Sequence, residues 1–330
     1  ILSMLFCGKL IDRMGKVPDG NTVMDFDAEE VSRHISISLA TANMEWDGCK
    51  INILDVPGFF DFEGEMIEAL KVADGVVIVT SAGGGITVGT EKAIDYCIKN
   101  HMPAMIFINQ MDKENADYVG TFEAIKAKYL NKIAPIQIPI MDGGKMSGYV
   151  SLISGKAYDF GPSGRTEIEL PDSLKNDFDT LKENLKEVAA SNDDDLMTKY
   201  FDGDELSREE IITGLNKGLS VGDSIPVLAG SAFFNKGIIN LLNQIVRLMP
   251  NPTSKKYIAK KDGKDLELTA DSNEGLVIQV YKTISDPFVG KLTLFRVVSG
   301  TLKTNSNLYN STIDKAEKIS SIYTMKGKKQ

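Results

Sequence analysis

The sequence predicts an α/β domain built on a mostly parallel sheet, followed by a smaller region of short β-strands. Apolar runs such as 75–79 and 104–108 have the length and composition of buried strands, and amphipathic stretches of helical period separate such runs. From Leu276 the pattern changes to short segments in which apolar and polar residues alternate. Apolar residues make up 42% of the chain and charged residues 25%, which is typical of a globular protein with large cores.

The first strand that ends in a chemically informative segment is the apolar run 50–54, which leads into Asp55-Val56-Pro57-Gly58. A carboxylate at the carboxyl end of a strand points into the crevice where α/β proteins hold ligands. Asp55 can hold the water shell of Mg²⁺, and the Gly58 amide can approach a terminal phosphate because no side chain stands in the way. The alternative is a strand followed by a plain Pro-Gly turn, without a ligand.

A second strand, 104–108, ends in Asn109-Gln110-Met111-Asp112. An amide followed three residues later by a carboxylate can recognise guanine, since the acid accepts from the ring N–H and the exocyclic amine. The amide reaches the opposite edge of the base and the neighbouring loops. The alternative is that Asn109 and Asp112 only cap a helix that starts near Asp117.

A third strand, 225–229, leads into the small residues Gly230-Ser231-Ala232. Backbone amides in this turn can face the carbonyl oxygen of a purine. Ser231 could instead cap a helix that begins near Lys236. Three strand ends in this order, each with matching chemistry, predict a guanine-nucleotide site.

At this point the chain resembles a known family, the translational GTPases. Its members have a P-loop-NTPase-type α/β G domain, and in elongation factor G, the ribosomal translocase, this domain carries an α+β insert and is followed by a β-barrel domain. The resemblance is stronger to elongation factor G than to initiation factors. The residues that carry it are Arg33–Ile37 for switch I, Asp55–Gly58, Asn109–Asp112 and Gly230–Ala232 for the third to fifth motifs, and Gly230–Gly237 and Ser285–Leu292 for elongation factor G.

The resemblance implies a GTPase that couples GTP binding and hydrolysis to ribosomal translocation. It implies GTP or GDP and Mg²⁺ as cofactors, and the ribosome, through ribosomal RNA and stalk proteins, as the partner. Ser36 and Asp55 would manage Mg²⁺, directly and through water. The implied nucleotide-binding residues are Gly58, Asn109, Gln110, Asp112, Ser231 and Ala232.

Three positions depart from the family pattern. Ser36 replaces Thr in switch I but keeps a hydroxyl that can ligate Mg²⁺, and Gln110 replaces Lys with loss of charge. Phe59 stands where the family has its catalytic His, and a phenyl ring cannot activate water, so the catalytic residue is unassigned. Either hydrolysis rests on the ribosome, Mg²⁺ and a phosphate-assisted route, or the protein is a slow or inactive GTP-dependent ribosome-binding regulator. A ribosome-protection factor of the tetracycline-resistance type is a third interpretation.

The phosphate-binding string G-x-x-x-x-G-K-[ST] occurs nowhere in the 330 residues. The loop of that pattern supplies most of the phosphate contacts in such proteins. We interpret the chain as a fragment without this loop, and expect it to bind GTP poorly and to be inactive, whereas the intact parent is a GTP hydrolase.

The spacing of these features predicts the domain layout. The stretch between Asn109 and Ser231 is longer than one or two βα units need, which predicts an insert. Acidic amphipathic helices are expected there over 172–190, 194–201 and 207–217, and in elongation factor G such an insert meets the ribosomal stalk. The predicted segments are 1–143 for the G domain, 144–224 for the insert, 225–250 for the final G-domain strand and helix, 251–275 for a linker and 276–330 for part of the β-barrel.

Composition excludes several other classes. Three cysteines without C-x-x-C spacing argue against a disulfide framework or a zinc site. No apolar run approaches the roughly 18 residues needed to span a bilayer, so we expect no membrane partner. We also expect a cytoplasmic monomer that does not bind DNA. The formal net charge of −9 leaves only local basic clusters, at 255–261 and 326–329, as candidate RNA contacts.

Overall fold

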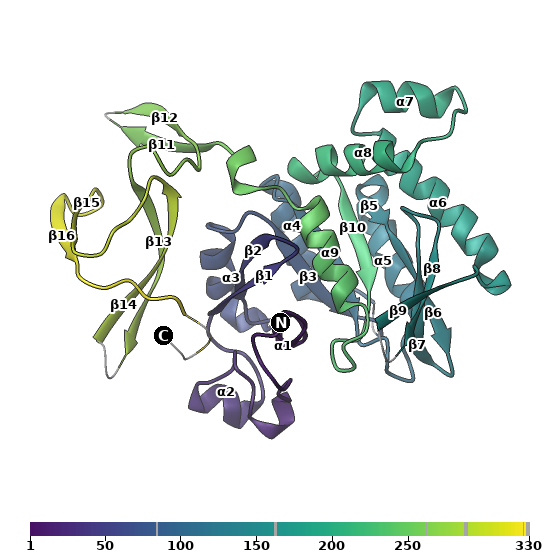
Figure 1. Ribbon diagram of the computed structural model, residues 1–330, viewed down its shortest axis with the longest axis horizontal. Coiled ribbons are helices and arrows are strands. Elements are labelled where there is room, and N and C mark those ends of the chain that lie inside the picture. The colour runs from purple at the N-terminus through teal and green to yellow at the C-terminus, as the bar shows by residue number, and fades with distance from the viewer. Residues whose placement is uncertain (84, 162–163, 262, 287–289, 326, 328–330) are drawn as a thin grey trace. The chain divides into compact units, whose positions relative to one another are not determined.

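The computed structural model describes residues 1–330 except 84, 162–163, 262, 287–289, 326 and 328–330 (Figure 1). Parts of the glycine turn at 83–85, of the segment 285–292 and of the lysine run at 326–329 therefore lie outside the described residues. The chain divides into two compact units. The first comprises Ile1–Met14, Met44–Ile51 and Asp74–Pro250, and the second comprises Gly15–Asn43, Asn52–Ala73 and Asn251–Gln330.

A four-stranded parallel sheet forms the centre of the first unit, as the sequence predicts. Its order is β3 (Val76–Ser81), β4 (Ala104–Asn109), β10 (Ile225–Ala229) and β5 (Ile133–Pro135). Every residue of β10 is buried, which explains why this strand is a continuous apolar run rather than an alternating one. Ala229 pairs with Ile108, so the carboxyl ends of β4 and β10 lie side by side.

Four helices accompany this sheet. They are α1 (Leu2–Cys7), α4 (Val88–Lys99), α5 (Tyr118–Tyr129) and α9 (Ile238–Leu248). The Asp117 side chain caps α5 by accepting from the Gly120 N–H, and α9 begins at Gly237 without a side-chain cap. Neither helix is capped by Asn109, Asp112 or Ser231, so the capping alternatives for these residues are wrong.

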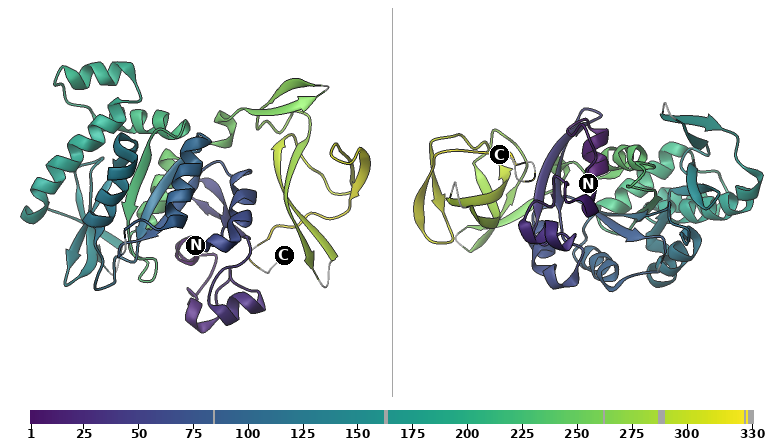
Figure 2. Two further views of the ribbon diagram at one scale, coloured as in Figure 1. Left: turned by 180° about the vertical axis from the view of Figure 1, so that it is seen from behind. Right: turned by 90° about the horizontal axis from the view of Figure 1, so that it is seen from below.

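The rest of the first unit is an antiparallel sheet with three helices. The strands are β6 (Gln137–Asp142), β7 (Lys145–Ser151), β8 (Ala157–Gly161) and β9 (Gly164–Ile168), in that order. The helix predicted from 172 begins with a 3₁₀ turn, Asp172–Leu174, before α6 (Lys175–Ala190). Helix α7 (Asp194–Phe201) has its predicted bounds and extends far from the parallel sheet (Figures 1 and 2). Helix α8 (Arg208–Ser220) runs three residues beyond its predicted end at 217.

Helix α8 begins with a capping box. The hydrogen bonds of this box make the stability of the fold depend on pH. Ser207 Oγ accepts from the Glu210 N–H, and a Glu210 carboxylate oxygen accepts from the Ser207 N–H at 2.7 Å. The Lys199 ammonium, then the Ser207 hydrogen bonds, lower the pKa of Glu210 from 4.5 to about 2. A depressed carboxyl pKa stabilises the fold above about pH 4.5, and this contribution is lost as pH falls toward 2.

We therefore expect Glu210→Gln to lower the melting temperature at pH 6 and to have a smaller effect at pH 3. The reason is that at pH 3 this carboxyl is mostly protonated in the unfolded chain, so the ionised carboxylate of the folded protein contributes less stability than at pH 6. Thermal unfolding followed by circular dichroism at both pH values measures this. Glu209→Gln, in the same helical turn, is the control, and an equal loss at both pH values would contradict the prediction.

The second unit contains short helices and paired strands. Helices α2 (Ala28–Arg33) and α3 (Glu63–Leu70) are followed, much later in the chain, by three two-stranded antiparallel sheets. Within the described residues these sheets do not join into a closed barrel. The strands are β11 (Tyr257–Lys261) with β12 (Lys264–Leu268), β13 (Val277–Asp286) with β14 (Gly290–Ser299), and β15 (Ser306–Asn310) with β16 (Lys315–Ile319).

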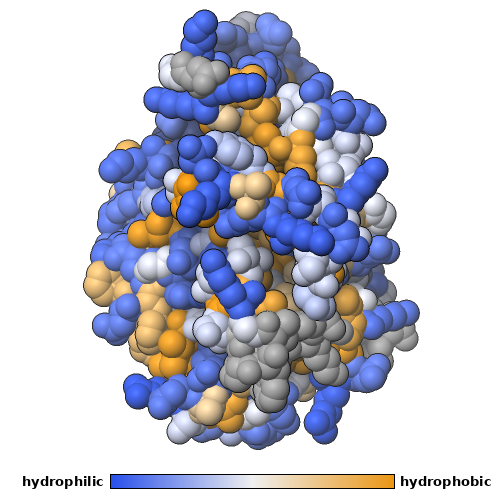
Figure 3. All heavy atoms as spheres, turned by 90° about the vertical axis from the view of Figure 1, so that its left-hand side faces the viewer, coloured by the Kyte–Doolittle hydropathy of each residue, from blue (hydrophilic) through white to orange (hydrophobic). Residues whose placement is uncertain are grey.

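Strand β15 starts only at Ser306, because the preceding Asn305 adopts a left-handed backbone conformation with φ of 56°. Figure 3 shows a face on which hydrophobic residues lie in small groups between hydrophilic ones. In the second unit, Val280 and Tyr309 are 57% and 68% exposed.

A hairpin contributes to both units. Strand β1 (Ala40–Trp46) pairs with β2 (Cys49–Asp55), and the turn between them is Asp47-Gly48, with φ of 47° and 73°. In the described structure β2 pairs only with β1 and is not part of the parallel sheet. None of the described helices is both long and apolar enough to span a bilayer.

Candidate functional site

The loops after β4 and β10 meet because their strands are neighbours. The Gly230 N–H donates to the Ile108 carbonyl at 2.9 Å, and the Met111 N–H donates to the Gly230 carbonyl at 3.2 Å. These backbone bonds join two loops that are more than 100 residues apart in sequence. The predicted segments 109–112 and 230–232 therefore form one site.

Side chains of these loops bind each other. Asn109 Oδ1 accepts from the Ala232 N–H at 2.9 Å, and Asp112 Oδ1 accepts from the Ser231 hydroxyl at 2.5 Å. One carboxylate oxygen of Asp112 is thus fixed by the protein. The other has lone pairs for a base that presents two donors on one edge, as guanine does.

The turn that carries Ser231 needs glycine at its start. The Ser231 and Lys236 backbones exchange hydrogen bonds of 2.9 and 3.0 Å, which closes the turn into a compact loop. A Cβ atom on Gly230 would lie 2.6 Å from the Lys236 carbonyl oxygen and 2.6 Å from the Phe107 ring. Such contacts are too short for any side chain. Only glycine at position 230 therefore allows the turn to lie this close to β4.

Helix α1 supports the same turn through residues that sequence reasoning missed. The Ser3 hydroxyl donates to the Ala232 carbonyl at 2.5 Å, and the Cys7 thiol bonds to Asn235 Oδ1 at 3.2 Å. Burial raises the pKa of Cys7, and the Asn235 contact opposes part of that rise. No motif spacing could reveal these contacts, since 229 residues separate Ser3 from Ala232.

The predicted magnesium and phosphate residues lie in the second unit. Ser36 donates its hydroxyl hydrogen to Asp25 Oδ1 at 2.6 Å, in a loop that Glu30 organises. The buried Glu30 carboxylate accepts four backbone N–H groups, from residues 26, 27, 37 and 38, at 3.0 to 3.1 Å. The segment that carries Ser36 is therefore anchored at both ends by one side chain.

Asp55 is the most strongly perturbed carboxyl of this unit. Burial, and after it the charges of Asp25 and Glu30, raise the pKa of Asp55 to about 6. Among the described residues, no group of three or more His, Cys, Asp or Glu side chains is arranged to hold a metal ion by itself. The set nevertheless fits Mg²⁺, which takes one or two protein oxygens plus water and phosphate, and whose charge would relieve this excess of carboxylates.

The segment after Asp55 is open. Apart from the neighbours of Gly58 in the chain, no atom of the described residues lies within 4 Å of the position that a Cβ on Gly58 would occupy, which leaves room for a phosphate. Phe59 and Phe60 follow with 55% and 53% of their surfaces exposed. Two adjacent and largely exposed phenyl rings therefore stand just before α3.

Glu65 of α3 connects three segments of the second unit. Its Oε2 accepts from the Leu39 N–H at 2.5 Å and from the Lys282 ammonium of β13. The Lys282 side chain is 11% exposed, so this ion pair is largely withdrawn from water. The Arg296 guanidinium of β14 also donates to the Val72 carbonyl, just beyond α3, at 2.5 Å. A movement of α3 would therefore change both the hydrogen bond to Leu39 and the ion pair to β13.

Comparison with known families agrees with this geometry. Residues 3–251 match the elongation factor Tu GTP-binding domain, and residues 275–330 match elongation factor G domain 2. The chain is an elongation factor G-like translational GTPase. It is also similar to a crystal structure of a protein from Thermus thermophilus, with a TM-score of 0.85 and 26% identity. That match covers 99% of this chain and 46% of the other, so the chain spans about half the length of its structural relative.

The loop after β4 of this translational GTPase differs from the expected arrangement at Gln110. Its backbone is left-handed, with φ of 66°, and its Oε1 accepts from the Ser81 hydroxyl at 2.8 Å. The side chain that the resemblance assigned to nucleotide binding is thus bound to the end of β3. Ser81, which binds the Gln110 side chain, is a further residue that the sequence motifs did not indicate.

A row of buried amides supports the loop after β10 from behind. Gln137, which is fully buried, donates to the Ala229 carbonyl at 2.8 Å and accepts from Asn240 at 2.7 Å. Its own backbone carbonyl accepts from the Tyr118 hydroxyl at 2.8 Å. Gln244 extends the row by donating to Asn240 Oδ1 at 3.4 Å.

Replacing Gln137 by Leu should destabilise the first unit by about 2–4 kcal/mol. Two buried polar groups, the Ala229 carbonyl and the Asn240 amide, would lose a partner, and each such loss costs about 1–3 kcal/mol. Chemical denaturation measures the change. Gln137→Glu is not a suitable control because it buries a charge. Asn131→Leu, at an exposed position of the 3₁₀ turn Leu130–Lys132, serves instead. A loss below about 0.5 kcal/mol would contradict the role of the amide row.

Proposed function

We propose an elongation factor G-like function, in which a GTPase couples GTP binding and hydrolysis to translocation on the ribosome when the phosphate-binding loop is present. The observation that carries this proposal is the meeting of Asn109 and Asp112 with Ser231 and Ala232, through hydrogen bonds of 2.9 and 2.5 Å. The match of residues 275–330 to elongation factor G domain 2 favours the translocase branch of the family.

Guanine selection would follow from the fixed geometry of these loops. Asp112 accepts from the two donors on the Watson–Crick edge of guanine, which adenine lacks in that arrangement. The Ser231 and Ala232 N–H groups donate to the Lys236 carbonyl and to Asn109, so these bonds fix the shape of the turn beside the base rather than bind its carbonyl oxygen. Asn109 holds the second loop in register by accepting from the Ala232 N–H.

Mg²⁺ would be held by Ser36 directly and by Asp55 through water. The ion would neutralise charge on the phosphates of the nucleotide. Asp55 supplies a carboxylate whose pKa is raised by burial and by Asp25 and Glu30, so a cation beside it favours the ionised form. Ser36 would exchange its hydrogen bond to Asp25 for the metal.

The nucleotide state would reach the β-rich part of the second unit through α3. Gly58 senses the terminal phosphate, and Glu65, one turn into α3, binds both Leu39 and Lys282. Loss of the phosphate releases Gly58 and lets α3 shift. Because one carboxylate holds both partners, the shift alters the switch segment and β13 together.

The remaining assignments belong to the same proposal. The protein would act as a cytoplasmic monomer, with ribosomal RNA and stalk proteins as partners and without membrane or DNA contacts. Helices α6 to α8 would meet the stalk. The proposed layout keeps the G domain at 1–143 and 225–250, the insert at 144–224, the linker at 251–275 and the β-barrel region at 276–330.

Phe59 favours a second candidate, a GTP-dependent ribosome binder with little turnover. Its ring has no group that can accept a proton or orient water, and it is 55% exposed. Such a protein would still change its ribosome affinity with the nucleotide state, because the route through Glu65 needs binding and not hydrolysis.

Turnover separates the two candidates. For nucleotide experiments we define the extended protein as this chain preceded by a G-x-x-x-x-G-K-[ST] loop and followed by the remaining domains of an elongation factor G. GTP hydrolysis is measured with and without ribosomes. Strong stimulation by ribosomes supports the translocase. Tight GTP binding without stimulated turnover overturns the enzyme and leaves the regulator, and a lack of GTP binding overturns both.

A further inference from the structure

One cavity of the first unit is lined by none of the residues of the proposed nucleotide site. It has a volume of about 260 Å³ and lies between the antiparallel sheet, the start of α8 and the face of α9. Four cationic side chains line it, and no carboxylate does among the described residues. We call it the basic cleft and define it by Lys156, Arg165, Arg208 and Arg247.

The cations of the basic cleft are only partly balanced. Lys156 pairs with Glu167 at 2.9 Å, and the Arg165 guanidinium lies 4.5 Å from the centre of the Tyr158 ring. For Arg208 and Arg247 no carboxylate partner is found in the described part of the chain. Arg208 also stands in the first turn of α8, where the helix dipole disfavours a cation. Three guanidinium groups that converge without acids favour a bound anion.

The basic cleft is also lined by the buried side-chain amide of Gln244. Gln244 is 6% exposed and ends the row of amides that starts at the Ala229 carbonyl. The direction of donation along that row leaves the Gln244 Oε1 atom facing outward from Asn240. This buried oxygen has no hydrogen-bond partner among the described residues. It needs a donor, which the phosphoryl group of a dianionic phosphate ester does not have and a hydroxyl group of the esterified sugar does.

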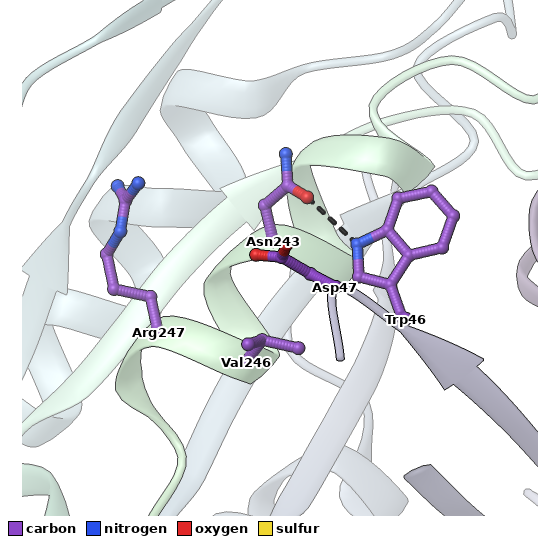
Figure 4. A pocket seen from close by; sticks show the side chains of 5 residues that line it. All are labelled: Trp46, Asp47, Asn243, Val246 and Arg247. Atoms are coloured by element: carbon purple, nitrogen blue, oxygen red, sulfur yellow. Dashed lines mark hydrogen bonds between the residues drawn. The ribbon is translucent and has the colours of Figure 1, made fainter. Parts of the chain in front are cut away.

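A wider hollow adjoins the basic cleft and shares Asn243 and Arg247 with it (Figure 4). The Trp46 indole N–H donates to Asn243 Oδ1 at 2.9 Å, as the dashed line shows. The carbonyl of Asn243 is therefore engaged, and its amide nitrogen is left as a further donor toward a ligand. In Figure 4 the Arg247 side chain extends away from Trp46.

We propose that the basic cleft binds a small phosphate ester with free hydroxyl groups, in the chemical class of sugar phosphates. Arg165, Arg208 and Arg247 bind the phosphate through their forked N–H donors. Gln244 Oε1 accepts a hydroxyl of the sugar. The volume is below the roughly 300–1,000 Å³ of sites for drug-sized ligands, which matches a ligand of this size. This inference does not depend on the proposed GTPase function.

Isothermal titration of the 330-residue chain at low salt tests the proposal. The probes are ribose 5-phosphate, inorganic phosphate and ribose. Ribose 5-phosphate should bind about tenfold more tightly than inorganic phosphate, and ribose should not bind. Arg208→Gln and Arg247→Gln should each weaken ribose 5-phosphate binding about tenfold, whereas Lys145→Gln, an exposed lysine at the start of β7, should leave it unchanged.

Several outcomes would overturn the proposal. Equal loss in the Lys145→Gln variant would mean attraction to overall charge, and equal affinity for inorganic phosphate would remove the role of Gln244. Loss of binding in Asp112→Asn would place the phosphate ester in the nucleotide site. Binding of an oligoglutamate peptide but not of ribose 5-phosphate would assign the cleft to an acidic protein segment. Unchanged circular dichroism spectra and melting temperatures establish that the variants fold.

Discussion

Asp112→Asn should convert the extended protein from a guanine binder into a xanthine binder. The carboxylate accepts two hydrogen bonds from guanine, and bonds to a charged group contribute about 1.5–3 kcal/mol each, so GTP affinity should fall roughly 10²- to 10⁴-fold. The asparagine amide can instead donate to the carbonyl oxygen that xanthine carries in place of the amine. Titration with fluorescent GTP and XTP analogues measures both affinities.

The structure offers a matched control for this substitution. Asp142→Asn removes the same charge from an exposed position on β6, and it should leave both affinities unchanged. Because Asp112 Oδ1 accepts from Ser231, Ser231→Ala should give a smaller loss of GTP affinity than Asp112→Asn. Retention of GTP selectivity in Asp112→Asn would show that another residue reads the base.

Phe59→His should raise ribosome-stimulated GTP hydrolysis of the extended protein about 10²- to 10⁴-fold if turnover is limited by this position, since that is the usual contribution of a positioned general acid or base. The imidazole can orient or activate water, which the phenyl ring cannot. GTP affinity should not change, because position 59 lies beyond Gly58 and does not contact the base. Single-turnover phosphate release with ribosomes measures the effect.

Phe60→His is the control for this gain. It places the same imidazole one residue away, at a site that is similarly exposed at 53% compared with 55%, and it should leave the rate unchanged. A rate that is high in the wild type and unchanged in Phe59→His would show that hydrolysis rests on the ribosome and Mg²⁺ without a side chain at this position. That result would support the translocase and reject the slow regulator.

The sequence by itself predicted the parallel sheet and the strand ends that carry the nucleotide motifs. Strands such as β4 and β10 are short apolar runs because both of their faces are buried, and this local composition is visible without a structure. The helices of the insert were predicted for a similar reason. Helix α7 has its predicted bounds, and the capping box of Ser207 and Glu210 is encoded within four consecutive residues.

Only the tertiary structure decided which residues support these motifs. Ser3 meets Ala232, Ser81 meets Gln110, and Gln137 meets Ala229 through hydrogen bonds that span 29 to 229 residues. Such partners leave no periodicity or spacing in the sequence, because any polar residue brought to the same point could serve. Strand order sets these distances, and strand order is a property of the folded chain.

The basic cleft, too, could not be predicted from the sequence alone. Its cations come from a loop, a strand and two helices, and each of them alone resembles an ordinary surface residue. The chain as a whole is acidic, with a net charge of −9, so composition argued against such a site. Folding alone brings the cations together over a buried amide oxygen without a partner, because electrostatic fields depend on distance in space and not on distance along the chain.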